Sequence, residues 1–219
     1  NEPGGVGGRF LRKEQPSLEA QLCNLADEIA YNAHDIDDGV RSGLITLAQL
    51  ADVPLFDHYR CVAQAEHPHL VGAAMERRLL YEAIRRMLSA QVYDVIEATN
   101  AALASAAPRS VADVRLAATL VGFSAPMRAQ SSELKRFLFK NLYRHPQVVE
   151  TTGRAQRVVT ELFAAYVAQP REMKPRFTRQ ALEGEPSARA RAVADFIAGM
   201  TDRFAGREHE RLTGLRLLG

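Results

Sequence analysis

Apolar residues recur every three to four positions along most of the chain, and this helical spacing constrains the fold more than any other sequence feature. The apolar–polar alternation of β-branched residues that marks a half-buried strand is almost absent. The pattern predicts an all-α fold, a bundle of about six to eight helices with one or two long ones. The expected helices span about residues 16–42, 54–68, 70–104, 131–143, 147–167 and 187–204, with an irregular stretch at 108–126 and a loop at 170–186.

The composition is that of an ordinary soluble globular protein. Of 219 residues, 47% are apolar and 25% charged, with a net charge of +2, which excludes collagen-like, disordered and rod-like coiled-coil classes. No run of apolar residues is long enough to cross a bilayer, so we expect no membrane partner. Only Cys23 and Cys61 are present, which argues against a disulfide framework and favours a reducing, cytoplasmic location.

The first fifteen residues differ from the rest of the chain. They are rich in glycine, and we expect residues 1–15 to form a flexible linker and residues 16–219 to form the helical part. The sequence has no initiator Met and starts within this linker-like stretch, which suggests a fragment of a longer protein.

The helix expected at residues 16–42 carries two opposed stripes. Ser17 is its predicted N-cap, and Glu19 lies in its first turn. At 100° per residue, one stripe is apolar and predicts the face toward the core. The apolar stripe consists of Leu18, Leu22, Leu25, Ile29, Ala33, Ile36 and Val40, and the opposite polar stripe consists of Asp27, Tyr31, His34, Asp35 and Asp38.

The charge of this helix is unusual. Between Ser17 and Asp38 there are six acids and no Lys or Arg, whereas solvated helices usually place a base four residues from an acid. A solvated face is one interpretation. The other is a site for a divalent metal ion or for sugar hydroxyls, both of which bind to carboxylates. One helix offers too few ligands for a tight metal site, so partners would come from elsewhere.

Four sequence runs resemble the bacterial dGTPase family, the HD-domain deoxynucleoside triphosphate triphosphohydrolases. Two are in the acidic helix, a third is similar to a late helix of the family, and the fourth is similar to its C-terminal signature. The first two are long and specific, and the resemblance covers most of the chain from Pro16 onward. The runs are Pro16–Leu22, Leu25–Gly39, Leu134–His145 and Asp195–Ala205.

The resemblance implies roles for the polar stripe. The family's metal site is written H…HD…D, and its last aspartate matches Asp27. Tyr31 matches the tyrosine that packs beneath the deoxyribose, and Asp35 matches the aspartate that bonds the 3′-hydroxyl. His34 and Asp38 are either residues that orient the ligands or bystanders on the helix face.

The resemblance also implies an activity. Family members hydrolyse a deoxynucleoside triphosphate to the deoxynucleoside and inorganic triphosphate, using a divalent metal ion (Mg²⁺, Mn²⁺ or similar) that activates water. The implied partners are a dNTP substrate and further copies of the chain, because family members commonly form homo-oligomers. Binding of nucleic acid is compatible with the resemblance, but no basic patch interleaved with aromatic residues indicates it.

The sequence departs from the family in one respect. The His and the His-Asp pair of H…HD…D should precede Asp27, yet the preceding 26 residues contain no histidine. The chain is therefore either the C-terminal part of such an enzyme or a degenerate homologue, and we expect it to be inactive by itself. The alternative function is a non-catalytic module for nucleotide sensing or oligomerisation.

Basic residues are the candidate group for a triphosphate, because Arg binds phosphate through two parallel hydrogen bonds. Two adjacent pairs, Arg77-Arg78 and Arg85-Arg86, lie eight residues apart in the long helix. Arg136 and Lys135, expected near a helix start, are similar candidates. For all six residues the competing interpretation is a solvated helix surface.

Two expectations concern burial. The helix at residues 16–42 should bury Leu22, Leu25, Ile29 and Ile36, and should leave Asp27 and Asp35 exposed and unpaired. Six aromatic residues at helical spacing should belong to the core and not to a ligand cage: Tyr81, Phe137, Phe139, Tyr143, Phe163 and Phe196.

Overall fold

The fold is all-α, as predicted. The computed structural model describes residues 7–70, 72, 75–183 and 185–217, and within these ranges it contains eleven α-helices and no strand. The chain forms two compact units, Asn1–His145 (unit 1) and Pro146–Gly219 (unit 2). None of the helices in the described ranges combines the length and the apolar character that crossing a membrane requires. Both cysteines are free and exposed.

The expected linker is partly helical. Residues 1–6 lie outside the described residues, but α1 (Gly8–Leu11) is a short helix. The chain then enters α2 (Leu18–Arg41), where Ser17 is the N-cap and its side chain accepts a hydrogen bond from the backbone N–H of Ala20. The predicted bounds of this helix are confirmed.

Helix α2 buries or half-buries all but one residue of its predicted apolar stripe. Ile29, Ala33 and Ile36 are buried, and Leu25 is half-buried. Leu22 was expected in the core, and that expectation is wrong, because half of its surface is exposed. It lies near the start of α2, where the helix borders an open apolar hollow lined also by Val95 and Ile96 of α5.

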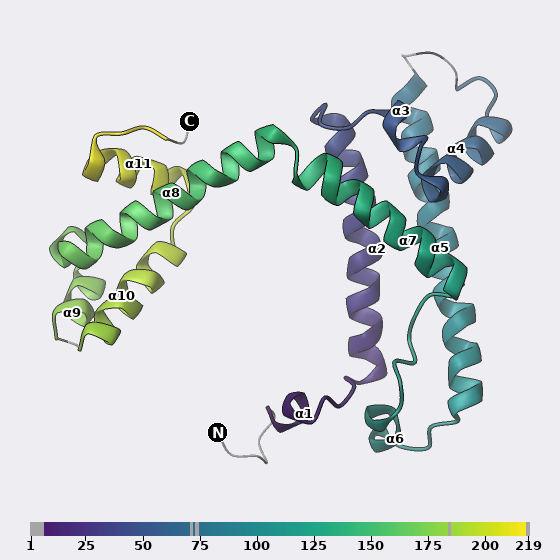
Figure 1. Ribbon diagram of the computed structural model, residues 1–219, viewed down its shortest axis with the longest axis horizontal. Coiled ribbons are helices and arrows are strands. Elements are labelled where there is room, and N and C mark those ends of the chain that lie inside the picture. Colours follow the sequence, from purple (N-terminus) through teal and green to yellow (C-terminus); the bar gives the residue numbers. More distant parts are fainter. Residues whose placement is uncertain (1–6, 71, 73–74, 184, 218–219) are drawn as a thin grey trace. The chain divides into compact units, whose positions relative to one another are not determined.

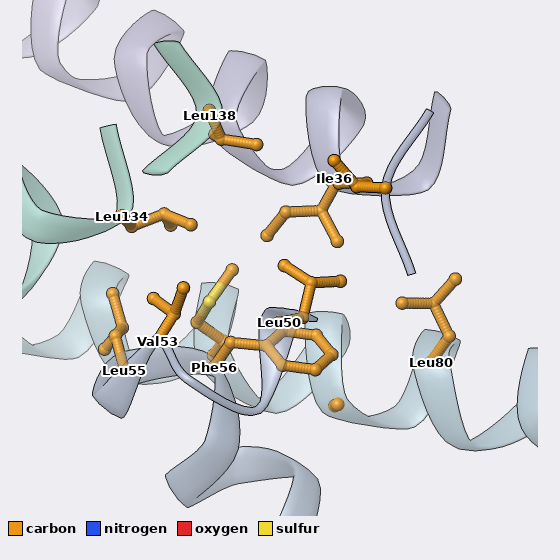
Figure 2. Close-up of a cluster of buried hydrophobic side chains, with 11 residues drawn as sticks. Ile36, Leu50, Val53, Leu55, Phe56, Leu80, Leu134 and Leu138 are labelled. Atoms are coloured by element: carbon orange, nitrogen blue, oxygen red, sulfur yellow. The ribbon is translucent and has the colours of Figure 1, made fainter. Parts of the chain in front are cut away.

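The main cluster of unit 1 joins four helices (Figure 2). Helices α4 (Pro54–Glu66) and α5 (Glu76–Ala106) pack against each other, and α2 and α7 (Ala125–Leu138) complete the core. The short helix α3 (Leu47–Leu50) adds Leu50 from the loop between α2 and α4. The buried residues are Ile36, Ile45, Leu50, Val53, Leu55, Phe56, Leu80, Ala83, Met87, Leu134 and Leu138.

A second cluster lies farther along the same helices. It brings together Ile29 of α2, Val95 of α5, and Val121 and Phe123 from the segment before α7. Met127 packs against both clusters. Helices α2, α5 and α7 therefore pack together in both clusters, and the two sets of contacts fix the position of each helix along its neighbours.

Several predicted boundaries in unit 1 are wrong. Helix α5 begins at Glu76 and not near residue 70, because Gly72 has φ +82°, a left-handed conformation that a helix excludes. The stretch 108–126 contains α6 (Val111–Leu116), capped by Ser110, and α7 begins before residue 131. Ser124 caps α7 with a proline in the first turn, which is a helix start signal.

Unit 2 has its own core, built from four helices (Figure 1). These are α8 (Pro146–Ala168), α9 (Pro175–Glu183), α10 (Pro186–Ala198) and α11 (Asp202–Thr213), with a 3-10 turn η3 (Pro170–Glu172) between the first two. The buried apolar residues are Val158, Leu162, Tyr166, Met173, Ala181, Ala192, Val193 and Phe196.

Two predictions for unit 2 are wrong. The segment 170–186 was expected to be a loop, but it contains α9, which starts at a proline and buries Ala181. The helix expected over 187–204 is two helices, because the chain leaves α10 at Gly199 and the Thr201 side chain caps α11 by accepting from the Phe204 N–H.

Candidate functional site

A groove of about 560 Å³ runs between α2 and the end of α7. Its lining combines four positions of α2, spaced as one face of a helix, with residues from the last turn of α7 and the turn that follows. We call it the α2–α7 groove. It is lined by Glu28, Tyr31, Asn32, Asp35, Lys135, Arg136, Leu138, Phe139 and Tyr143.

The turn after α7 has π-helical geometry, and it shapes one wall of the groove. This turn, η2 (Phe139–Tyr143), follows α7 without a break. A π-turn widens the helix and shifts the facing of the residues in it, so such turns are frequent at functional sites. Phe139 and Tyr143 are both about half exposed and line the groove, whereas Leu138, just before the turn, is buried in the main cluster.

A close approach at Gly39 fixes the end of α2 against this wall. A Cβ at Gly39 would lie 2.7 Å from Cδ1 of Ile45 and 3.4 Å from Cδ1 of Leu142. Ile45 is fully buried, so a Cβ at Gly39 would force its side chain to shift within the core. Glycine at this position therefore lets α2 approach Leu142, the residue next to Tyr143.

Asp35 and Tyr143 form the central hydrogen bond of the groove. The Tyr143 hydroxyl donates to Oδ2 of Asp35 over 2.6 Å, between residues 108 positions apart. This bond, with partial burial and the nearby Asp35 charge, raises the pKa of Tyr143 to about 12. The phenol therefore stays a donor at neutral pH and holds one oxygen of the Asp35 carboxylate.

The expectation that Asp35 is exposed and unpaired is therefore wrong. Asp35 is half-buried and paired with Tyr143, because η2 reaches across to α2. The expectation that Tyr143 and Phe139 belong to the core is also wrong, since both are exposed in the groove. Tyr81 and Phe163 are exposed as well, Phe137 is partly buried, and Phe196 is buried as expected.

Two cations lie on the α7 side of the groove. The Lys135 ammonium pairs with Glu28 over 2.9 Å, so its charge is neutralised locally. Arg136 donates from Nε to the backbone carbonyl of Ser132 and has no carboxylate partner among the described residues. Both residues lie in the last turn of α7 and not near a helix start as expected. Arg136 is thus the groove's available positive charge.

The other residues of the polar stripe lie outside the groove. Asp27 and His34 are exposed and have no hydrogen bond or ion pair within the described part of the chain. Asp38 is exposed and lies 3.9 Å from the Arg41 guanidinium. The expectation for Asp27 is confirmed, and the structure brings together only Tyr31 and Asp35 of the five predicted residues.

The residues present do not by themselves fit a divalent metal ion. A site of this kind needs several oxygen or nitrogen ligands around one point. Within residues 7–70, 72, 75–183 and 185–217, no group of three or more His, Cys, Asp or Glu side chains is arranged to hold one. Asp27 stands as a single carboxylate.

The four arginines of the long helix lie elsewhere. Arg77 donates to the Tyr81 hydroxyl, Arg85 pairs with Glu82, and Arg86 pairs with Glu66. Arg78 lines a smaller pocket of about 260 Å³ together with His67, His69, Leu70, Tyr81 and Glu82. None of the four lines the α2–α7 groove.

Comparisons with known proteins agree with the resemblance stated from the sequence. A model of the phosphohydrolase-associated domain matches residues 121–211. The chain is 49% identical over 98% of its length to a deoxyguanosinetriphosphate triphosphohydrolase-like protein of Ralstonia nicotianae, covering 54% of that protein. It is 51% identical over 95% of its length to the protein of the same name from Bordetella pertussis, covering 52% of it. The chain thus spans about half the length of these curated relatives.

Proposed function

This chain is homologous over nearly its whole length to the deoxyguanosinetriphosphate triphosphohydrolase-like proteins, and on that premise we propose that it is part of a metal-dependent dNTP triphosphohydrolase. The reaction releases a deoxynucleoside and inorganic triphosphate. One observation carries the proposal: Tyr31 and Asp35, which the resemblance assigns to the deoxyribose, line the same groove.

The groove residues support recognition of a sugar. The Asp35 carboxylate accepts a hydrogen bond from a sugar hydroxyl, while Tyr143 holds its other oxygen in place. Tyr31 is 61% exposed and offers an aromatic face on which a deoxyribose packs. Arg136 supplies positive charge beside the groove for an anionic substituent.

Asp27 has a narrower role in the proposal. It lies one helical turn before Tyr31 on α2, and we assign it one ligand position for a divalent metal ion such as Mg²⁺ or Mn²⁺. The remaining ligands would come from outside this chain. The described residues do not complete a metal site by themselves.

A second candidate is a non-catalytic module that senses nucleotides or mediates oligomerisation. The observation that favours it is that no three His, Cys, Asp or Glu side chains of the described residues, Asp27 included, are grouped to hold a metal ion. In either case we propose a cytoplasmic location, which the free cysteines favour. We also propose a homo-oligomer, because the resemblance implies one.

Incubation with dGTP and Mg²⁺ or Mn²⁺ separates the two candidates. We expect no release of inorganic triphosphate from the 219-residue chain, and metal-dependent release once the coding sequence upstream of Asn1 is included. That upstream sequence should encode a His and a His-Asp pair. Asp27→Ala in the longer protein should abolish release. Lack of turnover by the longer protein would favour the sensing module, and an active Asp27→Ala variant would contradict the role of Asp27.

A further inference from the structure

Three buried neutral side chains in the described part of unit 1 carry polar atoms without a hydrogen-bond partner. They are the amide nitrogen of Asn32, both amide atoms of Gln91 and the hydroxyl of Ser131. Gln91 is fully buried, Ser131 nearly so, and Asn32 is 6% exposed. An unpaired buried donor or acceptor costs about 1–3 kcal/mol, so three such residues in one unit require a reason.

The three residues occupy one layer of the fold. Asn32 lies on α2 between Ile29 of the second cluster and Ile36 of the main cluster. Gln91 lies on α5 between Met87 and Val95, and Ser131 lies on α7 between Met127, which packs against both clusters, and Leu134 of the main cluster. The three helices therefore place a polar layer between two apolar ones.

Of the three, only Asn32 lines the α2–α7 groove. It lies three residues before Asp35, a spacing that puts two side chains side by side on a helix. Its Nδ2 makes no hydrogen bond with the protein. A rotation of the side-chain amide that exchanges Nδ2 and Oδ1 therefore breaks no hydrogen bond of Nδ2. The rotation places Oδ1 in the buried position that Nδ2 holds and moves Nδ2 to the position of Oδ1.

We propose that Asn32 is a third recognition residue of the groove, whose Nδ2 donates to the oxygen of the same sugar hydroxyl that donates its proton to Asp35. A hydroxyl group is both donor and acceptor, and the carboxylate and the amide complement its two functions. This inference rests on the proposed function and deepens it. Asn32 thereby selects a ligand that carries a hydroxyl at this position over one that lacks it.

The test compares dGTP with its 2′,3′-dideoxy analogue, which lacks the 3′-hydroxyl. Dissociation constants are measured by calorimetry for the wild-type chain in metal-free buffer, and their ratio reports recognition of the hydroxyl. We expect the wild-type chain to prefer dGTP by about a hundredfold, since the hydrogen bonds to Asp35 and to Asn32 are both lost with the analogue.

Asn32→Leu should lower this preference by about tenfold and leave the affinity for the dideoxy analogue within about twofold. Gln91→Met is the matched control, because Gln91 belongs to the same buried layer but does not line the groove, and it should leave both affinities unchanged. Asn32→Ala serves as the second variant if the leucine variant loses helical content.

Each outcome decides a separate point. An Asn32→Leu chain that keeps the wild-type preference would overturn the role of Asn32 and leave the proposed function intact. A wild-type chain that binds both nucleotides equally well, or binds neither, would contradict sugar recognition by the groove, and the role of Asn32 with it.

Discussion

The two units differ in how some of their buried polar side chains are paired, although Gln21 of unit 1 is hydrogen-bonded through both of its amide atoms. In unit 2, the fully buried His209 has Nε2 2.6 Å from Oε2 of Glu161 and Nδ1 3.0 Å from the Leu215 carbonyl. The buried Tyr166 donates to Glu208, which pairs with Arg211. In unit 1, the buried Asn32, Gln91 and Ser131 carry polar atoms with no partner. The polar groups of unit 2 stabilise its fold, whereas the layer in unit 1 borders a groove that binds a ligand in our proposal.

The largest expected effect concerns His209. His209→Ala should lower the free energy of unfolding of unit 2 by about 3 kcal/mol, because it removes a buried ring and two hydrogen bonds. Hydrogen exchange of amides in α8 and α11 reports this loss for unit 2 alone. The control Glu150→Ala removes only the exposed pair with Arg154 and should cost less than about 0.5 kcal/mol. An equal loss in both variants would refute a structural role for His209.

Two helical glycines provide the next comparison. In unit 1, Gly39→Ala places a Cβ against the buried Ile45 and should destabilise the unit by about 2 kcal/mol. In unit 2, Gly153 lies within α8 with nothing within 4 Å of a Cβ. Gly153→Ala should therefore stabilise its helix by about 0.5–1 kcal/mol. Urea unfolding of each variant gives the sign, and destabilisation by both substitutions would contradict the close approach of α2.

A smaller effect sharpens the description of the groove. The pKa of Tyr143 is raised to about 12, so its bond to Asp35 contributes stability below pH 10 and loses it as the pH rises toward 12. At pH 11 the phenol should remain mostly protonated. The difference in absorbance at 295 nm between the wild-type chain and Tyr143→Phe measures its ionisation.

Asp35→Asn is the matched variant for this titration, because it removes the charge that opposes ionisation of Tyr143. It should bring the midpoint back toward the ordinary value of 10. Circular dichroism at each pH ensures that the chain remains helical. A Tyr143 midpoint near 10 in the wild-type chain would show that the bond to Asp35 is absent.

Much of the fold could be predicted from local signals. The N-cap Ser17 and the apolar stripe predict where α2 begins and ends, and the spacing of apolar residues predicts the extent of α8. Two of the errors share a cause, because Pro126 and Pro175 each lie in the first turn of a helix, where proline starts a helix and does not break it. The break between α10 and α11 depends on a Thr201 side chain in a sequence that otherwise suits one helix.

The groove could be predicted only in part. The resemblance pointed to Tyr31 and Asp35, but Tyr143 lies 108 residues away from Asp35 and reaches it through a π-turn, which no local pattern predicts. Asn32 was missed because it lies between the apolar and polar stripes of α2. Its unpaired amide is visible only when α5 and α7 are packed around it.

In our proposal, the α2–α7 groove binds the sugar of a nucleotide. The most direct measurement is the set of changes in backbone ¹H–¹⁵N chemical shifts when dGTP is added to the ¹⁵N-labelled 219-residue chain. We expect the largest changes on Tyr31, Asp35 and Tyr143, and Asp35→Ala should remove them. Changes confined to the smaller pocket around His67 and Arg78, or no changes at all, would contradict it.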